Sequence, residues 1–168
     1  MSHNQESEKN KATKVVVELE ALGHKPITFE MVGPSFAELA KEARRRVNKE
    51  DVFLFEKDGE SELSDIEGRS SILLVAHPCK RIGVSVNFEH QTKTETFSPS
   101  ATVFRVLSWA IGKHGFGLDD TARAKANLIL PGTDAPLPRD ETIGKYVPEG
   151  SCALTLELTL RDFTNGND

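Results

Sequence analysis

The sequence predicts an α+β protein made of two small domains in tandem. The order strand, strand, helix, strand, strand occurs twice along the chain, and each expected helix follows a local start signal. The chain's last strand alternates strictly, with Leu154, Leu156, Leu158 and Leu160 on one face. A chain of 168 residues has room for two such units, because compact domains begin at about 50 residues.

The composition excludes several classes of protein. Hydrophobic residues make up 38% of the chain, which suits small domains with a large surface relative to their core. The net charge of −5, without a long basic block, argues against a nucleic-acid partner. No apolar run approaches the roughly 20 residues of a membrane-spanning helix, so no membrane partner is expected. The two cysteines, Cys79 and Cys152, fit no metal-ligand spacing and indicate reduced thiols in a cytoplasmic protein.

The first set of elements begins with two alternating strands and continues with a helix. A capping box formed by Ser35 and Glu38 precedes a helical apolar stripe that reaches Val47. The strands are expected at 14–20, 27–31, 51–55 and 72–76. The triple arginine 44–46, in the last turns of the helix, is either a solvated helix end or a binding surface.

The second set repeats this order with different residues. Alternation predicts strands at 82–88 and 93–97, an apolar run predicts one at 127–130, and 153–161 forms the last strand. Ser98 is expected to cap the second helix, with Pro99 at its first position, and Gly115 and Gly117 to end it. The stretch 137–150 is expected to be an irregular connection, and Asp119, Asp120 and Asp134 to be solvated loop acids.

These elements divide the chain into five segments. The segments are a flexible leader at 1–12, a first domain at 13–77, a linker at 78–81, a second domain at 82–161 and a C-terminal tail at 162–168. Because the two halves share an order of elements and little sequence, they are interpreted as a tandem of one fold.

The second half resembles ubiquitin, which has the β-grasp fold. The resemblance covers about Ile82 to Arg161. It is carried in order by Asn127-Leu128-Ile129-Leu130-Pro131-Gly132, Leu137, Thr142-Ile143-Gly144-Lys145-Tyr146-Val147, Gly150-Ser151 and Leu154-Thr155-Leu156-Glu157-Leu158. The first half is similar in topology only. Two such domains followed by a tail resemble tandem ubiquitin-like modifiers, including the bacterial two-domain proteins of the BilA type from antiphage operons.

The resemblance implies a protein modifier that is not itself an enzyme and is attached through its C-terminus. Gly166 is the expected conjugation residue, since glycine has no Cβ and suits a narrow enzyme channel. Asn167 and Asp168 must then be removed, so the Gly166–Asn167 bond is the expected processing site. The implied partners are an E1-like activating enzyme, an E2-like conjugating enzyme, a JAB/JAMM-type metalloprotease and target proteins, with phage structural proteins among the candidates.

The chain departs from the ubiquitin pattern at three points. The usual Arg-Gly-Gly ending is absent, and the arginine that activating enzymes read in ubiquitin falls at Thr159. Ile129 matches the central isoleucine of ubiquitin's recognition patch, whereas the companion valine falls at Glu157. The resemblance therefore implies a cognate activating enzyme and no binding by ordinary ubiquitin receptors.

Three side chains are candidates for a partner surface: Ile129, Trp109 and Arg161. Trp109 lies off the main apolar stripe of its helix, where it serves either as an exposed anchor or as a cover for the edge of the core. Tyr146, the only tyrosine, is expected to tie a loop through its hydroxyl group.

Catalysis by this chain is not expected. Its five histidines are scattered, and the sequence has no nucleophile elbow, phosphate loop, metal motif or cofactor motif. His77 and Cys79 lack an orienting acid at a recognisable spacing. Two alternatives to the modifier remain open: a non-conjugated β-grasp adaptor, and a sulfur carrier.

Overall fold

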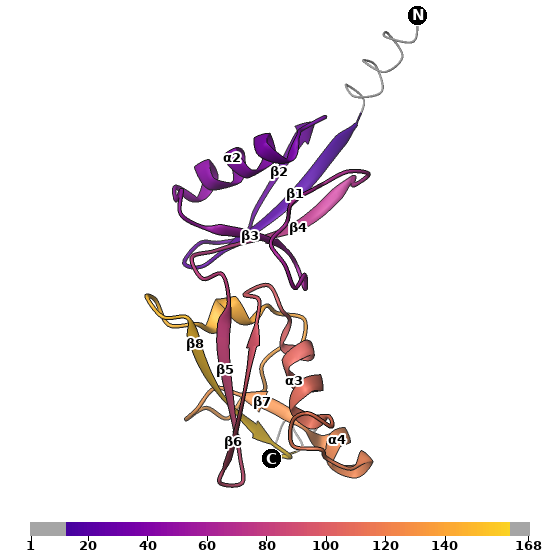
Figure 1. The fold of residues 1–168 in the computed structure, drawn as a ribbon, viewed down its shortest axis with the longest axis vertical. Coiled ribbons are helices and arrows are strands. Elements are labelled where there is room, and N and C mark those ends of the chain that lie inside the picture. Colours follow the sequence, from indigo (N-terminus) through magenta and orange to yellow (C-terminus); the bar gives the residue numbers. More distant parts are fainter. Residues whose placement is uncertain (1–12, 162–168) are drawn as a thin grey trace, which may run out of the picture. The chain divides into compact units, whose positions relative to one another are not determined.

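The computed structural model describes residues 13–161. The chain forms two compact units, Met1–Lys80 and Arg81–Asp168. In each, a four-stranded mixed sheet carries a helix on one face (Figure 1). The prediction of an α+β protein with two β-grasp domains is therefore confirmed.

The sheet of the first unit is built around two parallel central strands. Its strands are β1 (Lys14–Ala21), β2 (Ile27–Val32), β3 (Phe53–Glu56) and β4 (Ser71–His77), in the order β2-β1-β4-β3. β1 and β4 pair in parallel, with Val17 beside Ile72, and the outer pairs are antiparallel. The helix α2 (Phe36–Val47) contributes Leu39, Ala43 and Val47 to the core beneath it.

The capping box predicted from the sequence starts α2. The Glu38 backbone N–H donates to Ser35 Oγ at 3.1 Å, and the Ser35 N–H donates to Glu38 Oε1 at 2.9 Å. The bond from the Ser35 N–H to the carboxylate also holds the pKa of Glu38 below its usual value. Because both partners lie within one turn, this start could be recognised from sequence alone.

The sheet of the second unit repeats the arrangement of the first. Its strands are β5 (Ile82–Phe88), β6 (Gln91–Phe97), β7 (Asn127–Ile129) and β8 (Ala153–Thr159), in the order β6-β5-β8-β7. β5 and β8 pair in parallel, with Val84 beside Leu154. The helix α3 (Val103–Ile111) buries Val103, Val106, Leu107 and Ala110, the stripe expected from the sequence.

The predicted start of α3 is wrong. Ser98 is buried and its hydroxyl lies 2.8 Å from that of Ser100, so it does not cap the helix. Thr102 is the N-cap and accepts a hydrogen bond from the Arg105 N–H. The N–H groups of Val103 and Phe104 donate to the backbone carbonyls of Glu141 and Arg139. Backbone carbonyls that are distant in sequence therefore accept hydrogen bonds from the first N–H groups of α3, which have no partner within the helix.

The end of α3 is a tight turn that requires glycine. The helix ends at Ile111 with Gly112 as its cap, ahead of the expected end. The chain then folds back, so that the Phe116 N–H donates to Ala110 O at 2.7 Å and the Leu118 N–H to Ile111 O at 2.9 Å. A Cβ on Gly115 would lie 2.4 Å from the backbone oxygens of Trp109 and Ala110, a distance that carbon does not tolerate.

Two short helices occupy stretches that were expected to be irregular. Asp119 accepts a hydrogen bond from the Ala122 N–H and caps α4 (Asp120–Lys125), so it is not merely a solvated loop acid. The 3₁₀ helix η1 (Ile143–Tyr146) interrupts the connection before β8. The Tyr146 hydroxyl donates to the Glu141 carboxylate, which confirms that this tyrosine ties a loop.

The oxidation state of the two cysteines differs from the expectation. The expectation of reduced cysteines is wrong, because Cys79 and Cys152 are both disulfide-bonded and neither is a free thiol. That expectation rested on the number and spacing of the cysteines in the sequence, which do not report how close they lie in space.

The leader at 1–12 and the tail at 162–168, with Gly166 and Asn167, lie outside the described residues.

Candidate conjugation site

The strand β8 carries the chain out of the second domain toward its C-terminus. It lies between β5 and β7 in the sheet, and Leu154, Leu156 and Leu158 are buried beneath it. A strand paired on both sides and buried on one face is fixed in register, since a slip of one residue would expose all three leucines. The point at which the tail begins is therefore set by the core.

Arg161, the last described residue, is held by three hydrogen bonds. Its Nη1 lies 3.3 Å from Asp134 Oδ1, and its Nη2 donates to the backbone oxygen of Asp134 at 2.9 Å. Its N–H donates to Thr159 Oγ1 at 3.1 Å. We call the ion pair of Arg161 and Asp134, with its backbone contact, the exit clasp. The clasp joins the end of the β8 segment to the loop that follows β7.

The loop that presents Asp134 is ordered by a turn just before it. Gly132 has a φ of 79°, a left-handed conformation that suits glycine. Thr133 donates to Leu130 O through both its N–H, at 3.0 Å, and its hydroxyl, at 2.7 Å. Because this turn leads directly into Asp134, the exit clasp engages a positioned residue. The Asp134 side chain is 88% exposed, as expected of a solvated loop acid, and it also pairs with Arg161.

The exit clasp limits how far the expected conjugation residue can reach. Gly166 is five residues beyond Arg161, and an extended chain spans at most about 3.6 Å per residue. Gly166 therefore stays within about 18 Å of the clasp. Any group that reacts at Gly166 would therefore lie within about that distance of this end of the sheet.

Asp134→Ala should make the chain easier to cut after Arg161. Trypsin must draw the arginine side chain into its specificity pocket, and the clasp competes for that guanidinium. Because exposed ion pairs are worth up to about 1 kcal/mol, the cleavage rate should rise by up to about fivefold. Release of the 162–168 peptide, followed by mass spectrometry, measures that rate. Asp140→Ala, which removes another exposed carboxylate of the same domain, should leave the rate unchanged; equal rates in both variants would contradict a restraining clasp.

The exposed face of the second sheet is small and polar where ubiquitin carries an aliphatic patch. The Ser85 hydroxyl lies 3.3 Å from that of Thr94, and Thr92 Oγ1 donates to Asn87 Oδ1 at 2.6 Å. Ile129, half-buried on β7, pairs across the sheet with Glu157 of β8. Ile129 is the one aliphatic side chain among these six residues, and the Glu157 carboxylate lies beside it. The face therefore offers little apolar area to a receptor.

Ubiquitin receptors should therefore fail to bind this chain. Titration of a labelled ubiquitin-interacting helix should give no saturable signal, because burying Glu157 against an aliphatic receptor surface leaves its charge without a partner. Ubiquitin itself, measured in parallel, should bind the helix. Comparable binding by both proteins would contradict this interpretation of the face.

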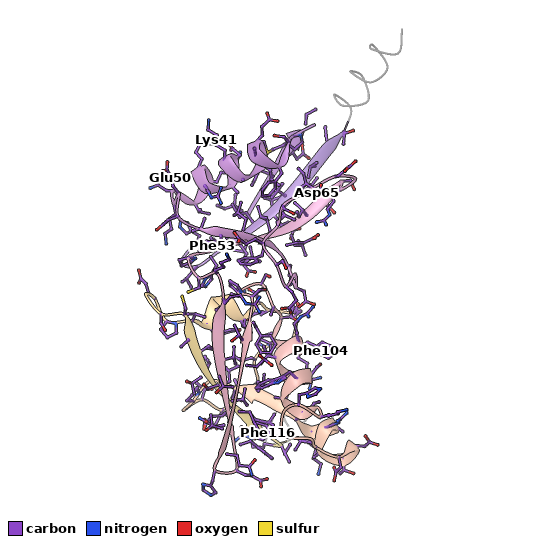
Figure 2. The ribbon with its side chains drawn as sticks, in the orientation of Figure 1. Lys41, Glu50, Phe53, Asp65, Phe104 and Phe116 are labelled. Carbon is purple, nitrogen blue, oxygen red and sulfur yellow. The ribbon has the colours of Figure 1, made fainter. Side chains whose placement is uncertain are left out.

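The aromatic side chains of α3 divide into a cover and an exposed residue. Trp109 is half-buried and meets Phe97 edge-on, with ring centroids 5.8 Å apart, so it covers the edge of the core. Phe104 is instead 56% exposed, and Figure 2 labels it on α3. A helical projection places Phe104 outside the buried stripe, as it does Trp109, but the sequence analysis considered only the tryptophan. Trp109 packs against Phe97 of β6, whereas Arg161 bonds to Asp134 and Thr159, so the two candidates belong to different sets of contacts.

Over residues 13–161 the structure holds no arrangement typical of a metal site. No group of three or more His, Cys, Asp or Glu side chains is placed there to hold a metal ion. None of the helices in this stretch is long and apolar enough to cross a membrane.

Comparison with known families decides which ubiquitin-like group the second domain resembles. Residues 83–161 match the family model for BilA ubiquitin-like domain 2. The match begins inside β5 and ends at Arg161, so it includes the whole of β8 and the exit clasp. It supports a BilA-type ubiquitin-like protein. The first unit lies outside the matched BilA stretch, and no curated protein matches the chain.

Proposed function

We propose that this chain is a ubiquitin-like protein modifier, made as a precursor, cut after Gly166 and conjugated through the glycine carboxylate. The proposal rests on one observation above all. The BilA-type match covers a β-grasp domain whose last strand delivers a seven-residue tail from a fixed point at Arg161.

Each chemical step of the proposal acts on the tail and not on the folded domains. Hydrolysis of the Gly166–Asn167 bond by a JAB/JAMM-type metalloprotease frees the Gly166 carboxylate. That carboxylate attacks the α-phosphorus of ATP on an E1-like enzyme and displaces pyrophosphate. A cysteine thiolate then takes the acyl group and displaces AMP. After transfer to an E2-like enzyme, a target lysine amine displaces the thiolate and forms an isopeptide bond.

The setting that fits this proposal is bacterial antiphage defence in the cytoplasm, a location that the disulfide-bonded cysteines do not themselves favour. The BilA-type match supports it, since the chain resembles the modifier component of such operons. Phage structural proteins are the proposed targets. The chain contributes the tag, and the partner enzymes contribute all catalytic groups and any metal.

The mature C-terminus tests the proposal most directly. Co-expression with a JAB/JAMM-type metalloprotease from a BilA-type operon should give a chain lacking Asn167 and Asp168, as measured by intact mass. A protease variant without its metal ligands serves as the control and should leave the full-length mass. A full-length chain in both cultures would count against processing at Gly166.

A second candidate is a non-conjugated adaptor made of two β-grasp domains. It is favoured by a basic groove on the first domain, far along the chain from the tail. An adaptor would keep its full-length mass and form no higher-mass species in the presence of the E1-like and E2-like enzymes. The intact-mass experiment therefore separates the two candidates.

A further inference from the structure

The helix α2 of the first domain carries a groove along its exposed side. The groove has a volume of about 820 Å³. Its lining includes the small or apolar side chains of Phe36, Ala37 and Ala40, which we call its floor. It also includes four cations, which we call its walls, and two other polar residues: Lys41, Arg44, Arg45 and Lys49, with Asn48 and Glu50. Figure 2 labels Lys41 on α2 and Glu50 in the turn that follows the helix. Four cations therefore surround an apolar floor within a chain whose net charge is −5.

The two arginines of the groove are held in place by the first domain itself. Arg44 donates from Nε and Nη2 to the Val52 carbonyl, at 3.3 and 3.1 Å. Arg45 forms a two-pronged pair with Glu42, at 3.0 and 2.5 Å. Hydrogen bonds from Arg45 and Arg46 lower the pKa of Glu42 to about 2. Arg44, part-buried and bonded to the backbone, therefore loses little freedom when a ligand binds, whereas the exposed Arg45 is held only by its surface pair with Glu42.

The third arginine of the triplet belongs to the opposite flank of the helix. Arg46 donates to Glu42 at 2.6 Å and lies over the ring of Phe29, 4.3 Å from its centroid. It does not line the groove. The triple arginine is thus neither a simple solvated helix end nor a single basic patch.

The two lysines of the groove have no partner of their own in the described part of the chain. Across residues 13–161, the Lys41 and Lys49 ammonium groups take part in none of the ion pairs or side-chain hydrogen bonds. Both residues are exposed. They stand at separate points along a groove that follows a helix about 18 Å long. This spacing suits a ligand that presents several carboxylates along one side.

We propose that this groove docks an acidic, amphipathic segment of a partner protein. Carboxylates of the segment would pair with Lys41 and Lys49, and an aliphatic side chain would rest on the alanine floor between them. Small floor residues let a partner backbone approach closely, as in other complexes in which an amphipathic helix lies in a groove. This inference does not depend on conjugation through Gly166.

Charge and floor together favour a protein over a nucleic acid as the occupant. A nucleic acid needs a broad basic surface for many phosphates, and this groove offers four cations on a chain that is acidic overall. The apolar floor would contribute nothing to phosphate contacts. An acidic protein segment uses both the cations and the floor.

Binding of designed peptides to the full-length chain tests the proposal. The probe is a fluorescent helical peptide with Glu along one side and Leu along the other, and its control replaces every Glu by Gln. Fluorescence anisotropy should show saturable binding of the Glu peptide only, weakening as salt rises. Lys41→Glu with Lys49→Glu should weaken that binding by about tenfold, equivalent to about 1.4 kcal/mol. Lys14→Glu with Lys25→Glu, the same charge change outside the groove, should alter it less than twofold, a difference of about 0.4 kcal/mol.

Several results would overturn the proposal. Equal binding of the Glu and Gln peptides would show that charge does not select the ligand. Equal weakening by the two double variants would show that only net charge matters. Tighter binding of a short DNA duplex would assign the groove to a nucleic acid, and loss of self-association in Lys41→Glu with Lys49→Glu would assign it to a second copy. Absence of binding by the Glu peptide at millimolar concentration would also reject it.

Discussion

Gly166→Ala should abolish the transfer of this chain to target proteins. The reacting carboxylate must pass through a narrow enzyme channel, and a Cβ at this position restricts the backbone and displaces the carbonyl. A misplacement of about 1 Å at a reacting centre costs about a hundredfold in rate. Higher-mass conjugates, detected by immunoblot in cells that contain the E1-like and E2-like enzymes, should fall below detection.

The conjugation experiment separates activation and transfer from proteolytic processing when it uses chains that are already shortened. Chains that end at residue 166 need no protease, so any remaining defect of the alanine variant lies in activation or transfer. Asn165→Ala in the same shortened chain is the matched control, because it alters the tail and keeps Gly166. Normal conjugates from the Gly166→Ala chain would reject Gly166 as the attachment residue.

Gly115→Ala should cause the largest loss of stability among the single changes discussed for the second domain. Its Cβ would lie 2.4 Å from the backbone oxygens of Trp109 and Ala110, and backbone atoms cannot rotate away as a side chain can. Overpacking of this kind costs about 3 kcal/mol. The melting temperature of the domain should fall by about 10 to 20 °C. Trp109 is the only tryptophan, so its fluorescence reports unfolding of this domain within the full chain.

Gly83→Ala is the matched control for that change. Gly83 lies in β5, and a Cβ there would meet no atom within 4 Å. Removing glycine's freedom in the unfolded chain should stabilise the domain by about 0.5 kcal/mol. Equal melting temperatures for the two variants would show that the turn after α3 can relax around a methyl group.

The sequence predicted the elements whose signals are local. The alternation of Leu154, Leu156 and Leu158 predicted β8, and all three are buried. Ser35 and Glu38 lie within one turn and predicted the start of α2. In both elements, the residues that stabilise the structure lie within the element itself and also form the sequence pattern that predicts it.

The sequence misplaced elements that depend on distant residues. The first N–H groups of α3 donate to the carbonyls of Arg139 and Glu141, and no local pattern announces such partners. Ser98-Pro99 resembles a helix start, yet Ser98 is buried beside Ser100. The helix α4 is six residues long, which is too short for a helical period to show.

Only the part of the candidate site that depends on local sequence could be predicted. Gly166 could be selected by its place after a ubiquitin-like strand. The partnership of Arg161 with Asp134 joins residues 27 positions apart and could not be inferred from either one. The groove on α2 emerged only from the structure, because the sequence treated the three arginines as one group.

The parallel pairing of β5 with β8 has a mechanical consequence. A load that pulls on Arg161 and resists at Ile82 draws these two strands past one another in opposite directions. The hydrogen bonds between them are then strained in shear and must break together, whereas an antiparallel hairpin such as β5–β6 can open one bond at a time when its ends are pulled apart. A modifier pulled through its C-terminal attachment would thus present its most resistant direction to a molecular motor.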